Sequence, residues 1–403
     1  MICSFRTLIG ALVASALLMG SAPADQLLTF KVDGTGKELG ETPLIFELTK
    51  PIGAGPAYAI KPLDGGPSLP ATVFKDEGKL YLGTVLDRLP ARGQRAFELI
   101  EAPADRSSSG VAFEEGQGKK IGIVVGGQPL MTYVPDDGPK PYYFPVIGPT
   151  GKRLTRAYPM EMVEGEKRDH PHHRSLWFTH GSVNKIDFWS ELPNHGTIRE
   201  TSRSIVGGAA VGLIRTTDDW IGPDGKKVCE DERVVRIYST KSTRVIDFDV
   251  TLKATVGPVV FGDTKEGSFG ARVATSMDVT SNKGGKIVNA DGITDKDAWG
   301  KPSPWVDYTG PVDGQTVGIA ILNHPDSFRY PTTWHVRDYG LFAANPFGYH
   351  DFGMKNSGEY TLPKGQSIRF VYRMILHEGA TSLPAMTAAF EGFASPPKVT
   401  ISE

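Results

Sequence analysis

The chain has 403 residues, of which 39 % are hydrophobic and 22 % are charged, and its formal net charge is −2 at pH 7. This near-neutral balance gives no electrostatic reason for binding nucleic acid or an anionic membrane surface, so neither is expected as a partner. Glycine (47) and proline (30) interrupt short apolar segments, which is typical of many strands joined by loops.

The first 24 residues have the layout of a secretory signal peptide. Arg6 supplies a positive charge, residues 7–20 form an apolar run, and residues 22–24 (Ala-Pro-Ala) are a small-residue cleavage pattern. The run is shorter than the ~20 apolar residues that a spanning helix needs, and no later segment approaches that length. We therefore predict cleavage after Ala24, a periplasmic or secreted location and no membrane span.

Cysteine usage agrees with a protein that depends on its apolar core. Cys3 lies in the predicted signal peptide, which leaves Cys229 alone. One cysteine in an exported chain cannot form an internal disulfide, so stability must come from burial of apolar surface.

Residues 25–115 are predicted to form a small N-terminal β-domain. Short apolar segments recur at roughly ten-residue spacing, as in a small β-sandwich. The strand candidates are 27–32, 44–48, 79–82 and 97–100. Residues 102–118 are polar and poor in large apolar side chains, so they are taken as the linker region, with a surface hairpin as the alternative.

Residues 119–403 are predicted to form one large domain with longer strands. In the segment 243–253, Ile246, Phe248, Val250 and Leu252 share one face, while the other face is polar. Further strand candidates are 120–125, 232–238, 270–279, 316–322, 339–344 and 367–377. One helix is predicted over 385–393, with Ser382 as N-cap and Pro384 in the first turn.

The fold class that follows is all-β, with a large antiparallel β-sandwich of about a dozen or more strands preceded by the small β-sandwich domain. In size and strand count the large domain resembles the supersandwich of galactose-mutarotase-like proteins. A likeness of that kind says little about function.

Four histidines lie within eleven residues, in DHPHHRSLWFTHG from Asp169 to Gly181. Imidazole suits proton transfer near neutral pH and metal ligation, and Pro171 places this segment in a loop or at a sheet edge. The alternative is a purely structural role, in which these imidazoles hold the loop in place by hydrogen bonds to backbone groups. The candidates are His170, His172, His173 and His180, with Arg174 and Trp177 as substrate-binding neighbours.

Two further segments concentrate polar groups between apolar strands. FGDTKEGSFGAR (261–272) contains Lys265, Glu266 and Arg272, and the alternative is a solvated hairpin. PTTWHVRDYGLFAANPFG (331–348) contains groups that bind polar ligands, namely Trp334, His335, Arg337 and Asn345, although Asn345 precedes a proline and could serve the turn alone.

Residues 143–189, FGDTKEGSFGAR and WHVRDYGLFAANPFG together resemble the bacterial PmoA-like family of unknown function, over roughly residues 120–395. The name refers to a methane monooxygenase subunit of a membrane complex, which does not fit a chain with no predicted span. The resemblance implies a connection with carbohydrate and no particular reaction.

Three hypotheses follow. The first is a lyase or hydrolase acting on a glycoside or modified sugar, with His172, His173 or His335 as acid or base, Glu266 as the partner acid, and Lys265 or Arg272 stabilising negative charge. The second is a glycan-binding module without catalysis.

The third hypothesis is a divalent metal site using His170, His172 or His180. No H-E-x-x-H motif or cysteine pair at zinc spacing accompanies these histidines in the sequence. In all three hypotheses the expected ligand is a small carbohydrate, and the three segments are expected to converge on one pocket.

Overall fold

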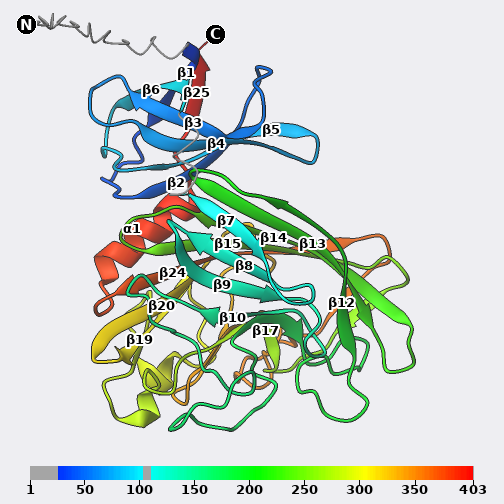
Figure 1. Ribbon diagram of the computed structural model, residues 1–403. Helices are drawn as coiled ribbons and strands as arrows, with labels where there is room; N and C mark the ends of the chain where they lie inside the picture. The colour runs from blue at the N-terminus through cyan, green and yellow to red at the C-terminus, as the bar shows by residue number, and fades with distance from the viewer. Residues whose placement is uncertain (1–25, 103–109, 403) are drawn as a thin grey trace, which may run out of the picture.

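The computed structural model describes residues 26–102 and 110–402 of the chain. The predicted signal peptide, Cys3 and residues 103–109 of the predicted linker lie outside the described residues. Within the described part, no helix is long and apolar enough to cross a membrane. Nearly all regular structure consists of antiparallel strands, so the predicted all-β fold class is confirmed (Figure 1).

Seven strands form the N-terminal sheet, in the order β2-β5-β4-β3-β6-β1-β25. Alternating apolar side chains, among them Phe30, Leu82 and Phe97, give this sheet a core of its own. The strands are β1 (Gln26–Asp33), β2 (Thr42–Glu47), β3 (Gly55–Pro62), β4 (Leu69–Asp76), β5 (Lys79–Leu86), β6 (Gln94–Glu101) and β25 (Val399–Ser402).

The limits of the two domains differ from the predicted ones at both ends. β25 pairs with β1, with Val399 opposite Val32, so the chain returns to the N-terminal sheet (Figure 1). β7 (Val111–Glu115) already pairs with β8 of the large sandwich. Both pairings cross the predicted division at 25–115 and 119–403. The pairing of β25 with β1 joins residues distant in sequence, which leaves no local pattern.

The large sandwich consists of two eight-stranded sheets. The first, here the β11 sheet, has the order β21-β22-β17-β11-β10-β9-β8-β7, and the second, the β14 sheet, has the order β12-β13-β14-β15-β24-β20-β19-β18. The remaining β11-sheet strands are β8 (Ile121–Val125), β9 (Gln128–Val134), β10 (Tyr142–Val146), β11 (Leu176–His180), β17 (Gly267–Arg272), β21 (Trp334–Val336) and β22 (Leu341–Ala344).

The β14 sheet contains the longest strands of the molecule. Its eight strands are β12 (Thr197–Val206), β13 (Val211–Ile221), β14 (Lys227–Tyr238), β15 (Arg244–Lys253), β18 (Lys286–Asn289), β19 (Trp305–Val312), β20 (Gln315–Asn323) and β24 (Ser367–Glu378). A separate pair, β16 (Val259–Phe261) and β23 (Tyr360–Leu362), completes the strands.

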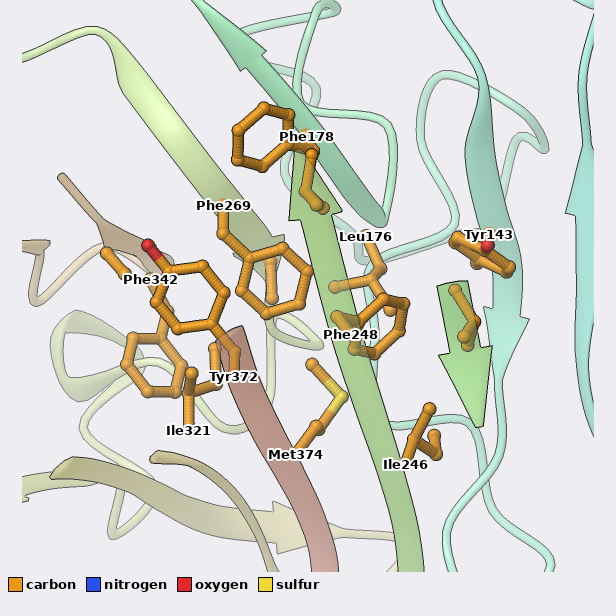
Figure 2. Packing of buried hydrophobic residues seen from close by; sticks show 14 of the residues in the cluster. Tyr143, Leu176, Phe178, Ile246, Phe248, Phe269, Ile321, Phe342, Tyr372 and Met374 are labelled. Carbon is orange, nitrogen blue, oxygen red and sulfur yellow. The ribbon is translucent and has the colours of Figure 1, made fainter. Parts of the chain in front are cut away.

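Aromatic side chains from both sheets meet in the main core (Figure 2). Phe248 of β15 lies against Phe269 of β17 with ring centroids 4.8 Å apart, and Phe269 stacks on Tyr372 of β24 at 4.9 Å. The predicted apolar face of β15, which includes Phe248, does point into this core. Burial of such rings is the main source of stability for a chain without a disulfide.

The predicted helix is present as α1 (Leu383–Ala394), with Ser382 as N-cap residue and Pro384 in its first turn. Its buried side chains Met386 and Phe393 pack with Trp305 and other apolar residues on the outer face of the β14 sheet. Figure 1 shows α1 beside the junction of the small sheet with the large sandwich.

A charged group lies inside the main core, on the inner face of the β14 sheet. Arg233 donates two hydrogen bonds of 2.8 Å to Asp231 and lies 3.5 Å from Asp218. Burial, above all, raises the pKa of the Asp218 carboxyl. Arg233 faces both carboxyl groups, in a place where an unpaired ion would be costly.

Replacing Arg233 by methionine is therefore expected to lower the free energy of unfolding by about 3–5 kcal/mol, because the two buried carboxyl groups would lose the cation that faces them. The control is Lys226→Met, which removes an ion pair with Asp224 between side chains that are 84 % and 56 % exposed. That change should leave the free energy of unfolding nearly unchanged. Urea unfolding of the two variants measures the difference, and equal losses would contradict the account.

Candidate functional site

A cavity of about 300 Å³, here called the histidine cavity, brings together three of the predicted segments. Two other hollows, of about 290 and 620 Å³, are lined by both the small sheet and the large sandwich, and neither has a histidine in its wall. The histidine cavity is lined by His170, His172, His173, Gly181, Asp187, Trp189, Ser190, Lys265, Glu266, His335, Arg337 and Tyr339.

The alternation of side chains in the β11 sheet places the cavity on the face opposite the main core. In β21 and the residue that follows it, Trp334 and Val336 join the main core, whereas His335 and Arg337 line the cavity. In β17, Phe269 belongs to the same core, and Arg272 points to the other side. Long connections before and after β11 complete the walls.

A network of charge-assisted hydrogen bonds fixes the loop before β11 to the sheet. Arg272 donates to both carboxylate oxygens of Asp169, at 2.8 and 2.9 Å, and to Nδ1 of His173 at 3.0 Å. Arg156 donates to Asp169 from the loop itself, at 2.6 Å, and to the carbonyl of His170 at 2.9 Å. The two guanidinium groups hold the pKa of Asp169 at about 2, below its ordinary value, despite partial burial.

Stacked rings form one wall of the cavity. His170 lies between Tyr339 and His173, with centroid distances of 5.3 and 4.8 Å. His173 in turn stacks on Trp177 at 5.3 Å and meets Trp189 edge-on at 5.8 Å. Such a stack resists rotation of each ring, so the imidazoles are held at defined positions.

Hydrogen-bond partners determine which nitrogen of two imidazoles carries the proton. Arg272 can only donate, so Nδ1 of His173 accepts and its proton resides on Nε2. His335 donates from Nδ1 to the carbonyl of Lys265 at 2.8 Å, so its Nε2 is an acceptor, and that atom has no partner among the described residues. The cavity wall thus presents one imidazole donor and one imidazole acceptor.

His172, His173 and His335, which line the cavity, are uncharged at neutral pH. Burial lowers the pKa of His172 to about 4 and that of His335 to about 3, and it places the pKa of His173 well below its ordinary value. His172 differs from the other two because its ring makes no hydrogen bond within the described part of the chain. It is therefore an uncharged base that is free to accept a proton.

Glu266 has the opposite electrostatic environment. Burial raises the pKa of its carboxyl, while the nearby Lys265 ammonium opposes that shift. The Lys265 Nζ lies 3.8 Å from Glu266 and 3.9 Å from Asp351, so neither contact is a hydrogen bond. Glu266 thus retains its proton to higher pH than an ordinary glutamate.

A close approach between two backbones places Glu266 at the cavity. The N–H of Gly181 donates to the carbonyl of Glu266 at 2.6 Å. A Cβ at position 181 would lie 2.6 Å from the Cβ of Glu266, which is too short for any side chain. Glycine is therefore required where the loop after β11 passes the loop before β17.

All five predicted catalytic candidates line the histidine cavity, and so does Arg337, one of the candidates for substrate binding. The five are His172, His173, His335, Lys265 and Glu266.

The other candidates for substrate binding lie elsewhere. Arg272 and Trp177 support His173 from behind, and Arg174 forms a bidentate pair with Glu191. Trp334 faces the main core and donates from its indole to the carbonyl of Ser303.

Asn345 also has a structural position, because both ends of its amide bond the backbone. Its Nδ2 donates to the carbonyls of Thr264 and Lys265, and its Oδ1 accepts from the N–H groups of Phe347 and Gly348. The amide holds the Lys265 loop in place and leaves no group for a ligand.

The predicted metal ligands are not arranged as a site. His180 follows Leu176 and Phe178 on the core face of β11, and its Nε2 donates to the carbonyl of Gly262 at 2.8 Å. It therefore points to the face opposite His170 and His172. Among residues 26–102 and 110–402, no group of three or more His, Cys, Asp or Glu side chains could hold a metal ion.

Sequence reasoning missed several residues that support the cavity. Arg156 and Lys140 are buried and carry no recognisable motif. Lys140 donates to Glu191 at 2.7 Å, and burial lowers its pKa to about 8. Asp187 did have a signal, because an aspartate that precedes a serine by three residues is typical of a turn closed by its own side chain.

Asp187 uses its carboxylate to close that turn. One oxygen accepts from the N–H groups of Trp189, at 2.7 Å, and Ser190, at 3.0 Å, and the other accepts from the Ser190 hydroxyl. Of the carboxyl groups that line the cavity, Glu266 is therefore the one without such bonds.

Residues 120–391 match the model of one protein family, the Family of unknown function (DUF6807). Nothing links this family to the PmoA-like name, and that resemblance stays a prediction. No curated protein is similar enough to count as a match.

The solved structures that resemble the chain include two from Enterococcus faecalis. One is a protein in the glycosyl hydrolase family 38 from Enterococcus faecalis, with a TM-score of 0.40, 10 % identity and coverage of 93 % of this chain and 47 % of the other. The second is an alpha-mannosidase from Enterococcus faecalis V583, with a TM-score of 0.38, 11 % identity and coverage of 93 % and 46 %. The chain spans about half the length of these structures.

The Asp169 network leads to a prediction about stability and pH. Replacing Asp169 by asparagine leaves the buried Arg156 and Arg272 without their carboxylate, and should lower the free energy of unfolding by about 2–4 kcal/mol at neutral pH. The expected loss in the free energy of unfolding is smaller than for a fully buried ion pair, because the Asp169 side chain is 38 % exposed.

The difference between wild type and D169N should shrink on acidification. The folded-state pKa of Asp169, about 2, is below its ordinary 3.8, so its stabilisation is complete above 3.8 and is lost as the pH falls through 2. Chemical unfolding at several pH values measures this difference. Asp313→Asn, at a carboxylate that is 68 % exposed, is the control and should show little change. A pH-independent difference for D169N would refute the account.

Proposed function

We propose a function from the site itself, because the chain belongs to a family of unknown function (DUF6807) whose model matches well over half of its length. The proposed function is that of a carbohydrate-active enzyme that breaks a bond to a sugar by proton transfer, as a lyase does. His172 is the base, Glu266 is the acid, and His173, His335 and Lys265 bind and polarise the substrate.

One observation carries this proposal. An imidazole whose pKa burial lowers to about 4 and a carboxyl group whose pKa burial raises line the same small cavity. Environments that push the proton affinities of two neighbouring groups in opposite directions are typical of an acid and base pair. Within the described residues, neither the His172 ring nor the Glu266 carboxyl makes a side-chain hydrogen bond of normal length.

The carboxyl groups favour elimination over hydrolysis. Glycoside hydrolysis uses two carboxyl groups, one as acid and one as base or nucleophile. Here Asp187 is bound to its own turn, which leaves Glu266 as the one carboxyl available in the cavity wall. A lyase needs one acid and one base, and an imidazole can serve as the base.

The lining also fits a sugar. Hydroxyl groups both donate and accept, and the wall offers a donor at Nε2 of His173, an acceptor at Nε2 of His335 and an ammonium at Lys265. The rings of Trp189 and Tyr339 supply apolar surface beside these groups. A few placed polar groups on an otherwise apolar wall are typical of a small-molecule site.

The proposal predicts a large kinetic effect from two substitutions. With a glycan that the wild type cleaves, His172→Ala and Glu266→Gln should each lower kcat by about 10²–10⁴-fold, the usual worth of a placed acid or base. His350→Ala is the control, because His350 is exposed and does not line the cavity. Its kcat should be unchanged.

The substrate panel should include neutral oligosaccharides, uronate-containing oligosaccharides and 3-keto-glycosides, with product detected by mass spectrometry. If the protein cleaves no substrate of any of these classes, the proposed enzymatic function is contradicted. Binding without product, unaltered in H172A, would instead identify a glycan-binding module.

A further inference from the structure

Among the described arginines that are not exposed, Arg337 is unusual because its guanidinium has neither a carboxylate nor a carbonyl partner. Within residues 26–102 and 110–402, every other arginine that is not exposed donates to a carbonyl or contacts a carboxylate. Arg272 and Arg156 bond Asp169, and even Arg329, which has no carboxylate, donates to the carbonyl groups of Pro346 and Gly358. Arg337 is half-buried and makes neither kind of contact.

Two aromatic rings hold this guanidinium at the cavity. The Cζ of Arg337 lies 5.5 Å from the ring centroid of Trp299 and 5.5 Å from that of Tyr339. Contacts of this kind use the faces of the planar group and leave its N–H edges unused. Since Arg337 follows His335 by two residues and both line the cavity, those donors belong to the proposed site.

A second cation lies in the same wall. The Lys265 ammonium is more than 3.5 Å from both carboxylates beside it, so its hydrogen-bonding capacity is also largely unused. Both cations act on the His335 ring, where they help burial to keep it uncharged. A half-buried guanidinium without a carboxylate, as at Arg337, is costly, and an anionic ligand would supply the missing partner.

We infer that the substrate carries a carboxylate, as a uronic acid sugar does, and that Arg337 binds this carboxylate. This inference rests on the proposed function and names its substrate class. A planar carboxylate matches the fork of donors on a guanidinium in a bidentate way. The substrate carboxylate also makes the C–H bond on the adjacent carbon more acidic. A neutral sugar has no such group, and a sulfate ester at another carbon does not have this effect.

The corresponding step balances without any further reagent. His172 removes the proton from the carbon next to the carboxylate, and the electrons of that C–H bond form a carbon–carbon double bond. The bond from the neighbouring carbon to the glycosidic oxygen breaks, and this oxygen leaves with the electron pair and takes a proton from Glu266. Arg337 stabilises the negative charge that develops on the carboxylate. His172 then loses its proton to water and Glu266 regains one.

The test uses the full chain with oligomers of a 4-linked uronic acid, the same oligomers with their carboxyl groups reduced to alcohols, and sulfated neutral oligomers. Calorimetry measures affinity, and ultraviolet absorbance of the new conjugated double bond measures turnover. The wild type should bind and cleave only the uronate. Arg337→Gln should weaken uronate binding by about 10- to 100-fold, as expected for loss of a charge-assisted pair, and Arg337→Lys should recover part of it.

Arg168→Gln, at an exposed arginine outside the cavity wall, is the matched control and should behave as wild type. Equal affinity of the wild type for acidic and reduced oligomers, or unchanged uronate binding in R337Q, would overturn the inference. Cleavage of a neutral or keto sugar in that case would leave the proposed function standing. Uronate binding that depends on Arg337 but yields no product would support the inference and refute the lyase. Preferential binding of the sulfated oligomers would overturn the choice of carboxylate.

Discussion

The carboxylate of Asp169 is the point on which the site depends. It lies between the guanidinium groups of Arg156 and Arg272, one from the loop before β11 and the other from the sheet beneath it. Because Arg272 also donates to His173, the same ion pair that fixes the loop determines which nitrogen of that imidazole carries its proton. Loop position and hydrogen-bonding chemistry are therefore coupled through one side chain.

The β11 sheet separates stability from chemistry by simple alternation. Trp334 and Phe269 point into the core that holds the two sheets together, while His335 and Arg272 point to the opposite face. A sheet packed on one face can carry polar groups on the other without loss to its core. The long connections around β11 then cover that polar face, which lowers the proton affinity of the imidazoles by burial.

Much of this organisation could be predicted from local sequence. Periodic apolar residues identified β15, and the N-cap Ser382 with Pro384 identified the helix α1. The concentration of charge and imidazole identified the three segments that line the cavity. The residues Trp-His-Val-Arg at 334–337 also carried a usable signal, because their alternation separates core from site. Trp334 was nevertheless expected in the site, since aromatic rings suit both places equally well.

The remaining features depend on contacts that no local pattern records. The pairing of β25 with β1 joins the two ends of the described chain, and the contact between Arg156 and Asp169 closes a loop thirteen residues long. His180 points into the core because side chains alternate between the two faces of β11, and this strand begins only after His173. Partner choice in such cases is decided by three-dimensional geometry, so residue types alone could not assign these roles.

The central claim is that the cavity presents uncharged imidazoles with fixed tautomers, and histidine-ring NMR tests it most directly. Long-range proton–nitrogen correlation spectra at neutral pH, assigned with His173→Ala and His335→Ala variants, distinguish the two neutral tautomers from the charged form. The account predicts that His173 carries its proton on Nε2 and His335 on Nδ1, and that both stay neutral on mild acidification. A charged ring at neutral pH, or the opposite tautomer at His173, would contradict it.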